Sequence, residues 1–317
     1  MNNILITSAG QRVALVRSFQ ETLRRFFPEA KVYTTDMNPK LAPAAYVSDG
    51  CFDVPRVTSP NYISQLLDIC KENQIGMIIP TIDTELLVLA ENKNLFDENN
   101  IFVSVSSPDF IRICRDKRNT GKFFEKHGIR VPQSIDKNNP TFPLFAKPYD
   151  GSLSTNLHYI RSAEELTTEI LKDPKLLFME YIDKDVYKEY TVDMYYGRDH
   201  KVKCIVPRER IKIRAGEINK GLTEKEPLTK YLFDRLETID GCVGCICIQV
   251  FLNPQTADVV GIEINPRFGG GYPQTYAAGG NYSEMLIREY FLGETVEYFD
   301  GWKDHLLMLR YDDAVYV

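Results

Sequence analysis

Four polar residues in the C-terminal third of the chain have the types and spacing to hold a metal ion beside a phosphate group. Glu263, Asn265 and Arg267 alternate in the segment Glu-Ile-Asn-Pro-Arg, so on a strand their side chains point to one face. Gln249 lies on the apolar segment before the turn at 253–258 and can lie beside Glu263 in a hairpin. Carboxylate and amide oxygens suit Mg²⁺, and a guanidinium can bind the charge of a phosphoryl or acyl phosphate group. We therefore predict Gln249, Glu263 and Asn265 as metal ligands and Arg267 as a catalytic cation.

A simpler explanation is that this hairpin only presents a polar face to solvent. Apolar residues alternate with the polar ones on both of its strands (Ile246, Ile248, Val250, Val260 and Ile262). The hairpin is therefore expected to be half-buried. A glycine run at 269–271 follows directly, and glycine lets the backbone approach a ligand closely. The pattern favours a binding site.

The first hundred residues predict the elements that would support this hairpin from one side. Strand-like apolar runs lie at 4–7, 31–35, 76–80 and 101–105, and apolar residues at helical spacing lie over 11–27, 62–70 and 83–91. This alternation predicts an α/β domain over 1–107, an open parallel sheet with helices on both faces. Asp36, Asp83 and Glu85 follow strands, at the edge where such sheets bind ligands. Capping and turn roles explain these three acidic residues equally well.

The rest of the chain predicts two further units of α+β type. Over 108–187 we expect a small unit with helices at 116–127 and 163–171 and strands at 144–147, 157–160 and 176–182. Over 188–317 we expect antiparallel strands at 189–196, 201–206, 243–252 and 259–264, a charged loop at 208–225, a helix at 228–239 and a last strand-like segment at 306–317.

Composition narrows the class of protein. The chain has 317 residues, 44% of them hydrophobic and 26% charged, with a net charge of −6, which is typical of a globular protein and argues against a nucleic-acid binder. No apolar stretch approaches the length of a membrane span. The N-terminal apolar run is short and lacks a preceding basic stretch, so it reads as a strand. Seven cysteines without a secretory signal favour reduced thiols and a cytoplasmic location.

These motifs together resemble the ATP-grasp superfamily, and within it the carbamoyl phosphate synthase large-subunit-like branch. The family's metal pattern is an acidic residue or glutamine followed by E-x-N-x-R, which Gln249, Glu263, Asn265 and Arg267 match. Glutamine in the first position is similar to the carbamoyl phosphate synthase variant. The resemblance implies a pre-ATP-grasp domain followed by a two-lobed ATP-grasp fold.

The resemblance also implies a nucleotide site upstream of the hairpin. Lys117 and Lys147 match the two lysines that bind nucleotide phosphates, and the loop at 149–155, with Ser152 and Ser154, resembles the loop that covers them. This loop contains one glycine, fewer than in many members of the family.

Adenine and ribose would be held by the residues that follow. Glu180, Tyr181 and Ile182 match the strand whose backbone binds the base. Glu189 matches the carboxylate that binds the ribose hydroxyls, since its two oxygens suit a vicinal diol. The alternative for Glu189 is a surface pair with Lys184 or Lys188.

Two arginines of the basic stretch 208–214 are candidates for binding the γ-phosphate or the acyl phosphate. Arg210 is the first choice and Arg214 the second, and a solvated strand explains both as well.

The function implied is a carbon–nitrogen ligase that joins a small carboxylate to an amine through an acyl phosphate, using ATP and Mg²⁺, with Mn²⁺ as an alternative metal. No Ser-His-Asp or Cys-His arrangement is evident, and this chemistry needs none. The alternatives are carbamoyl phosphate synthesis, phosphoryl transfer and a nucleotide-binding regulator without turnover. Carbamoyl phosphate synthase is disfavoured, because its large subunit resembles two tandem copies of this unit. A homodimer is compatible with the resemblance.

Overall fold

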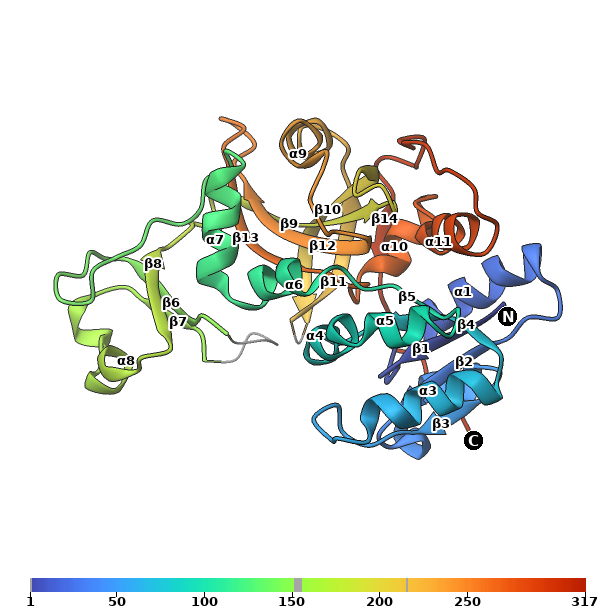
Figure 1. Cartoon of the computed structure of the whole chain (residues 1–317). Helices are drawn as coiled ribbons and strands as arrows, with labels where there is room; N and C mark the ends of the chain where they lie inside the picture. The colour runs from blue at the N-terminus through green and yellow to red at the C-terminus, as the bar shows by residue number, and fades with distance from the viewer. Residues whose placement is uncertain (1, 151–155, 215) are drawn as a thin grey trace.

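The computed structural model describes residues 2–150, 156–214 and 216–317, which form three sheets (Figure 1). The first sheet belongs to the N-terminal domain, the second to a small lobe at the far end of the molecule, and the third to a large lobe between them (Figure 1). The predicted α/β and α+β fold class is confirmed. Each sheet lies within one of the predicted segments 1–107, 108–187 and 188–317, and those boundaries stay predictions.

The first sheet is entirely parallel, with the strand order β3-β2-β1-β4-β5. Its strands are β1 (Asn3–Thr7), β2 (Val32–Asp36), β3 (Cys51–Asp53), β4 (Ile75–Pro80) and β5 (Phe102–Val103). Its helices are α1 (Val13–Phe26), α2 (Pro43–Val47), α3 (Tyr62–Glu72), α4 (Asp83–Glu91) and α5 (Lys93–Asp97). The short elements β3 and α2 were not predicted, because neither is long enough to show a periodic apolar pattern.

The small-lobe sheet is antiparallel, with the order β7-β6-β8. It consists of β6 (Leu144–Pro148), β7 (His158–Ile160) and β8 (Leu176–Glu180). The helix expected over 163–171 is instead a 3₁₀ turn (Ala163–Glu165) followed by the short helix α8 (Thr168–Lys172). This lobe has its own small core, formed by Leu144, Ala146, Ile160, Leu176 and Phe178.

The large-lobe sheet has the order β13-β12-β9-β10-β11-β14. Its strands are β9 (Lys188–Tyr196), β10 (Val202–Arg214), β11 (Glu217–Thr223), β12 (Gly244–Leu252), β13 (Val259–Asn265) and β14 (Leu307–Leu309). Its helices are α9 (Leu228–Leu236), α10 (Tyr272–Ala277) and α11 (Tyr282–Tyr290). Helices α6 (Pro108–Arg115) and α7 (Lys117–Lys126) also pack here, since Phe110 and Phe124 are buried in the core of this lobe.

The prediction of a charged loop over 208–225 is wrong. Strand β10 continues to Arg214 and pairs antiparallel with β11, with Arg208 opposite Thr223 and Arg214 opposite Glu217. This strand is buried at its start and exposed at its end, so its charged residues gave no apolar alternation to recognise. The expected last strand is also shorter than 306–317, because only Leu307–Leu309 pairs with β11.

The N-terminal domain and the large lobe share one hydrophobic core. Ile4 and Phe19 from the first domain belong to the same cluster as Tyr195, Tyr272 and Tyr282 of the large lobe. The ring of Phe19 meets that of Phe268 edge to face, with centroids 5.5 Å apart. This contact holds α1 against the segment that follows β13. Among the described residues, no helix has both the length and the apolarity to cross a membrane.

Candidate active site at the junction of the three sheets

The predicted metal ligands lie together on paired strands. Gln249 on β12 is directly opposite Glu263 on β13, as the sequence predicted. The Asn265 side chain donates to Glu263 Oε1 at 3.1 Å, and its oxygen accepts from Arg267 Nη2 at 3.4 Å. One carboxylate and two amides therefore face the same space from two adjacent strands.

Arg267 is fixed by the N-terminal domain. Its Nη2 donates to Asp83 Oδ2 at 2.8 Å, and each side chain is 16% exposed. Burial lowers the pKa of the Arg267 guanidinium, but the attraction of Asp83 outweighs it and leaves the pKa above its ordinary value. Asp83 is also the first residue of α4. Its ion pair with Arg267 gives it a second role besides starting that helix.

The two predicted nucleotide lysines approach the metal strands from the opposite side. Lys147 on β6 is only 8% exposed. Burial lowers the pKa of its ammonium, the attraction of Glu263 opposes this shift, and the repulsion of Lys117 adds to it, so that the pKa is about 8. These interactions place Lys147 within electrostatic reach of both residues. The backbone N–H of Lys117, at the head of α7, donates to the Tyr149 carbonyl at 2.9 Å.

The predicted adenine strand is the end of β8. The Glu180 carboxylate accepts from Arg130 at 2.5 Å and from the Gln133 N–H at 3.1 Å, which anchors the strand to the preceding segment. The Tyr181 ring stacks on Tyr159 with centroids 4.2 Å apart, and Ile182 is 6% exposed. The predictions for Ser152 and Ser154 lie outside the described residues.

Glu189, the predicted ribose ligand, lies beside the first-choice arginine. Its Oε1 is 2.9 Å from Arg210 Nε, and its Oε2 is 3.5 Å from Lys184 Nζ. The alternative pair with Lys184 is therefore present as well, whereas Lys188 pairs with Glu209 at 2.9 Å.

The two arginine candidates differ in their surroundings. Arg210 also donates to Thr191 Oγ1 and to the Gly216 carbonyl, both at 3.0 Å. Arg214 pairs with Asp312 at 2.5 Å, and its side chain is 64% exposed. The roles assigned to both arginines stay predictions, and the geometry brings only Arg210 into contact with another predicted nucleotide ligand.

The glycine run after Arg267 packs so closely that side chains are excluded. A Cβ at Gly269 would lie 2.9 Å from Cys247 Sγ, and one at Gly271 would lie 1.9 Å from Arg208 Nη1. Below this run, Arg208 pairs with Asp193 at 2.6 Å, and both side chains are fully buried. The run is therefore seated on a buried ion pair, which fixes the backbone beside Arg267.

Arg12 is the residue of this site that sequence reasoning missed. It precedes α1, and its Nη1 lies 3.9 Å from Glu217 Oε1. Burial lowers the pKa of its guanidinium, and the nearby Arg267 lowers it further. The only sequence signal was its place after the turn at 8–10, where a helix N-terminus can receive an anion.

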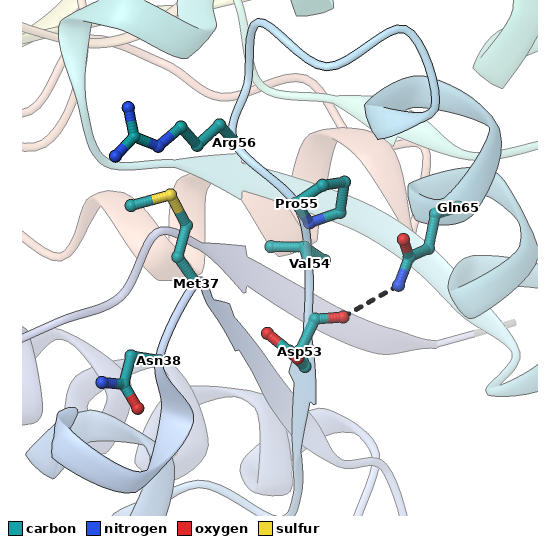
Figure 2. A pocket seen from close by; sticks show the side chains of 7 residues that line it. All are labelled: Met37, Asn38, Asp53, Val54, Pro55, Arg56 and Gln65. Carbon is teal, nitrogen blue, oxygen red and sulfur yellow. Dashed lines mark hydrogen bonds between the residues drawn. The ribbon is translucent and has the colours of Figure 1, made fainter.

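A pocket of about 610 Å³ lies at the carboxyl edge of the first sheet, next to the ends of β2 and β3. Figure 2 shows its lining, in which Met37, Asp53 and Arg56 surround the space and Gln65 donates to the Asp53 carbonyl at 2.9 Å. It begins next to Asp36, whose carboxylate accepts from the Gly10 N–H at 3.1 Å.

Comparison with known proteins agrees with this architecture. Residues 4–104 match the family described as "PylC-like, N-terminal domain", and residues 172–311 match the family "ATP-grasp in the biosynthetic pathway with Ter operon". The chain is similar to the 3-methyl-D-ornithine–L-lysine ligase of Methanosarcina acetivorans, with 26% identity over 284 residues, covering 85% of this chain and 69% of the relative.

Two solved structures share the fold at low sequence identity. One is the biotin carboxylase domain of the Hydrogenobacter thermophilus 2-oxoglutarate carboxylase with MgADP and bicarbonate, with a TM-score of 0.71, 14% identity, and 95% of this chain and 72% of that chain covered. The other is the L-amino acid ligase of Bacillus licheniformis, with a TM-score of 0.67, 15% identity, and 92% and 74% covered. Together these comparisons make the chain similar to ATP-grasp ligases: an ATP-grasp family model matches residues 172–311, a curated ligase is 26% identical, and the solved structures share the fold.

Proposed function

We propose that this protein joins a small-molecule carboxylate to an amine with ATP and Mg²⁺, through an acyl phosphate, and releases ADP and phosphate. One observation carries the proposal. Lys147, from the small lobe, lies within electrostatic reach of both Lys117 and Glu263, and Glu263 is paired with Gln249. The lysines proposed to bind phosphate and the residues proposed to bind the metal therefore lie at one junction.

The donor set fits Mg²⁺. Gln249, Glu263 and Asn265 offer oxygen ligands, and Mg²⁺ takes one or two such ligands together with phosphate oxygens and water. With glutamine in the first position, Glu263 is the one carboxylate of the set and the main protein ligand by charge. When bound, Mg²⁺ neutralises phosphate charge.

The side chains of the site would act by positioning and by charge. Lys117 and Lys147 bind the nucleotide phosphates, and Glu180, Tyr181, Ile182 and Glu189 hold the nucleoside. Arg267, aligned by Asp83 at 2.8 Å, stabilises the charge that develops as the substrate carboxylate attacks the γ-phosphorus. The amine then attacks the acyl carbon and phosphate leaves, so no protein nucleophile is required.

Amino acids are the substrates we propose to test first. The similar ligase from Methanosarcina acetivorans is named for 3-methyl-D-ornithine and L-lysine, and an L-amino acid ligase shares the fold. The test incubates the protein with MgATP and pairs drawn from the twenty standard amino acids and D-ornithine. ADP formation and the mass of the condensed product are measured.

The outcomes separate the proposal from its alternatives. ADP together with a condensed product supports the ligase. ADP with a stable phosphorylated acceptor would identify a phosphoryl transferase instead. A wider screen adds sugar acids, simple carboxylic acids and amines, and binding of MgATP without ADP formation from any of these pairs would indicate a nucleotide-binding regulator. A cytoplasmic location and a homodimer also stay predictions.

A further inference from the structure

The seam between the N-terminal domain and the large lobe contains two pairs of charged side chains. Asp83 pairs with Arg267 at 2.8 Å, and Arg12 lies 3.9 Å from Glu217. The two pairs lie close together, because Glu217 packs against Gly270, three positions after Arg267: a Cβ at Gly270 would lie 2.3 Å from Glu217 Oε1. Arg12 and Asp83 come from the first domain, whereas Arg267 and Glu217 come from the large lobe.

The two cations are unequally compensated. Arg267 donates to Asp83, to Asn265 and to the Phe268 carbonyl. Arg12 makes no side-chain hydrogen bond to any residue within 2–150, 156–214 and 216–317, and its one ion-pair partner there is Glu217. Glu217 itself pairs more closely with Arg310, at 2.7 Å. Arg12, whose side chain is 21% exposed, is thus a mostly buried cation with its donors largely unused.

A bridging anion would satisfy this arrangement. Burying a guanidinium without hydrogen bonds is unfavourable, and placing a second one nearby adds repulsion. The Nε of Arg267 is also buried without a partner in the described part of the chain. An anionic group between the two side chains would accept charge-assisted hydrogen bonds from both.

We propose that Arg12 and Arg267 together bind the substrate carboxylate and the acyl phosphate formed from it, so that one anion is held by both domains. This rests on the proposed ligase function. It assigns the second cation of the acyl-phosphate site to Arg12 rather than to Arg210, because Arg210 already contacts Glu189, Thr191 and the Gly216 carbonyl. Glu217 competes weakly for Arg12 at 3.9 Å and is displaced when the substrate binds.

The first test measures anion binding without turnover. Inorganic phosphate is titrated by calorimetry into the protein saturated with MgADP. Arg12→Gln is expected to weaken phosphate binding about 10- to 100-fold, as expected for the loss of charge-assisted hydrogen bonds. Arg12→Lys should retain part of the affinity. Arg17→Gln, at an exposed position on the helix that follows Arg12, is the matched control and should bind phosphate like the natural protein.

The second test separates this proposal from the proposed function. With an active carboxylate in hand, Arg12→Gln should raise its KM about 10- to 100-fold and lower kcat, with KM for MgATP unchanged. If the natural protein turns over and Arg12→Gln keeps both the KM for the carboxylate and the phosphate affinity, the Arg12 assignment is wrong and the ligase stands. If no substrate supports ADP formation, the ligase proposal fails, and the phosphate titration alone decides the role of Arg12. Absence of phosphate binding to the MgADP form would also overturn the assignment.

Discussion

Replacing Lys147 with methionine should make the protein more stable while it disables nucleotide binding. Lys147 is 8% exposed, and burial lowers the pKa of its ammonium from 10.5 to about 8. This shift corresponds to a destabilisation of about 3 kcal/mol by the buried charge. This destabilisation is a net value that already includes the favourable attraction to Glu263. Methionine has a similar length and no charge, so it should remove this destabilisation.

The pH dependence of this effect has a definite sign. The pKa of Lys147 is lower in the folded than in the unfolded protein, so the penalty is full below about pH 8 and disappears above about pH 10.5. The difference in free energy of unfolding between Lys147→Met and the natural protein should therefore fall from about 3 kcal/mol at pH 7 to about 1 kcal/mol at pH 9.5.

Urea denaturation of both proteins at the two pH values measures this difference, and calorimetry with MgATP measures the loss of affinity. We expect the affinity for MgATP to fall about 10- to 100-fold, because a charge-assisted contact to phosphate is lost. Lys122→Met, at an exposed position on α7, should change neither quantity. A Lys147→Met protein that is less stable than the natural one at pH 7, by an amount that stays constant to pH 9.5, would refute the reasoning.

Three further changes test other parts of the site. Glu263→Gln should lower ATP turnover more than about 100-fold at a fixed Mg²⁺ concentration, since it removes the one carboxylate of the metal set; turnover that matches the natural protein would show that Glu263 holds no metal. Arg214→Ala should leave the melting temperature nearly unchanged and turnover within about twofold, because its pair with Asp312 is exposed; a large loss of kcat would restore it as a catalytic cation. Gly271→Ala should lower the melting temperature strongly, since its Cβ would lie 1.9 Å from Arg208 Nη1, whereas Gly121→Ala, with no atom within 4 Å, should be neutral or stabilising; equal melting temperatures would contradict the packing described for the glycine run.

The sequence predicted those parts of the fold in which local pattern and tertiary structure agree. The parallel sheet of the first domain and the hairpin β12–β13 follow from apolar periodicity and turn residues. The pairing of Gln249 with Glu263 followed from counting back from the turn. Strand β10 was predicted only in part, because burial is complete at Arg208 and lost by Arg214.

The missed parts of the site depend on contacts between distant segments. Asp83 and Arg267 are separated by 184 positions, so nothing local shows that they form a pair. Arg12 likewise follows an ordinary turn. Its position near Arg267 results from the hydrophobic core in which α1 packs against Phe268. Motif residues that are close in sequence were recognised, whereas residues brought in by domain packing were not.

The core shared by the first domain and the large lobe limits how this protein could be modified by recombination. Exchanging the N-terminal domain for that of a relative would leave Tyr195 and Phe268 facing side chains that did not evolve to fit them. The small lobe, whose five buried residues pack among themselves, is the more interchangeable module. Chimaeras that aim to alter the choice of substrate should therefore graft individual loops at the edge of the first sheet and keep α1 with its native partners.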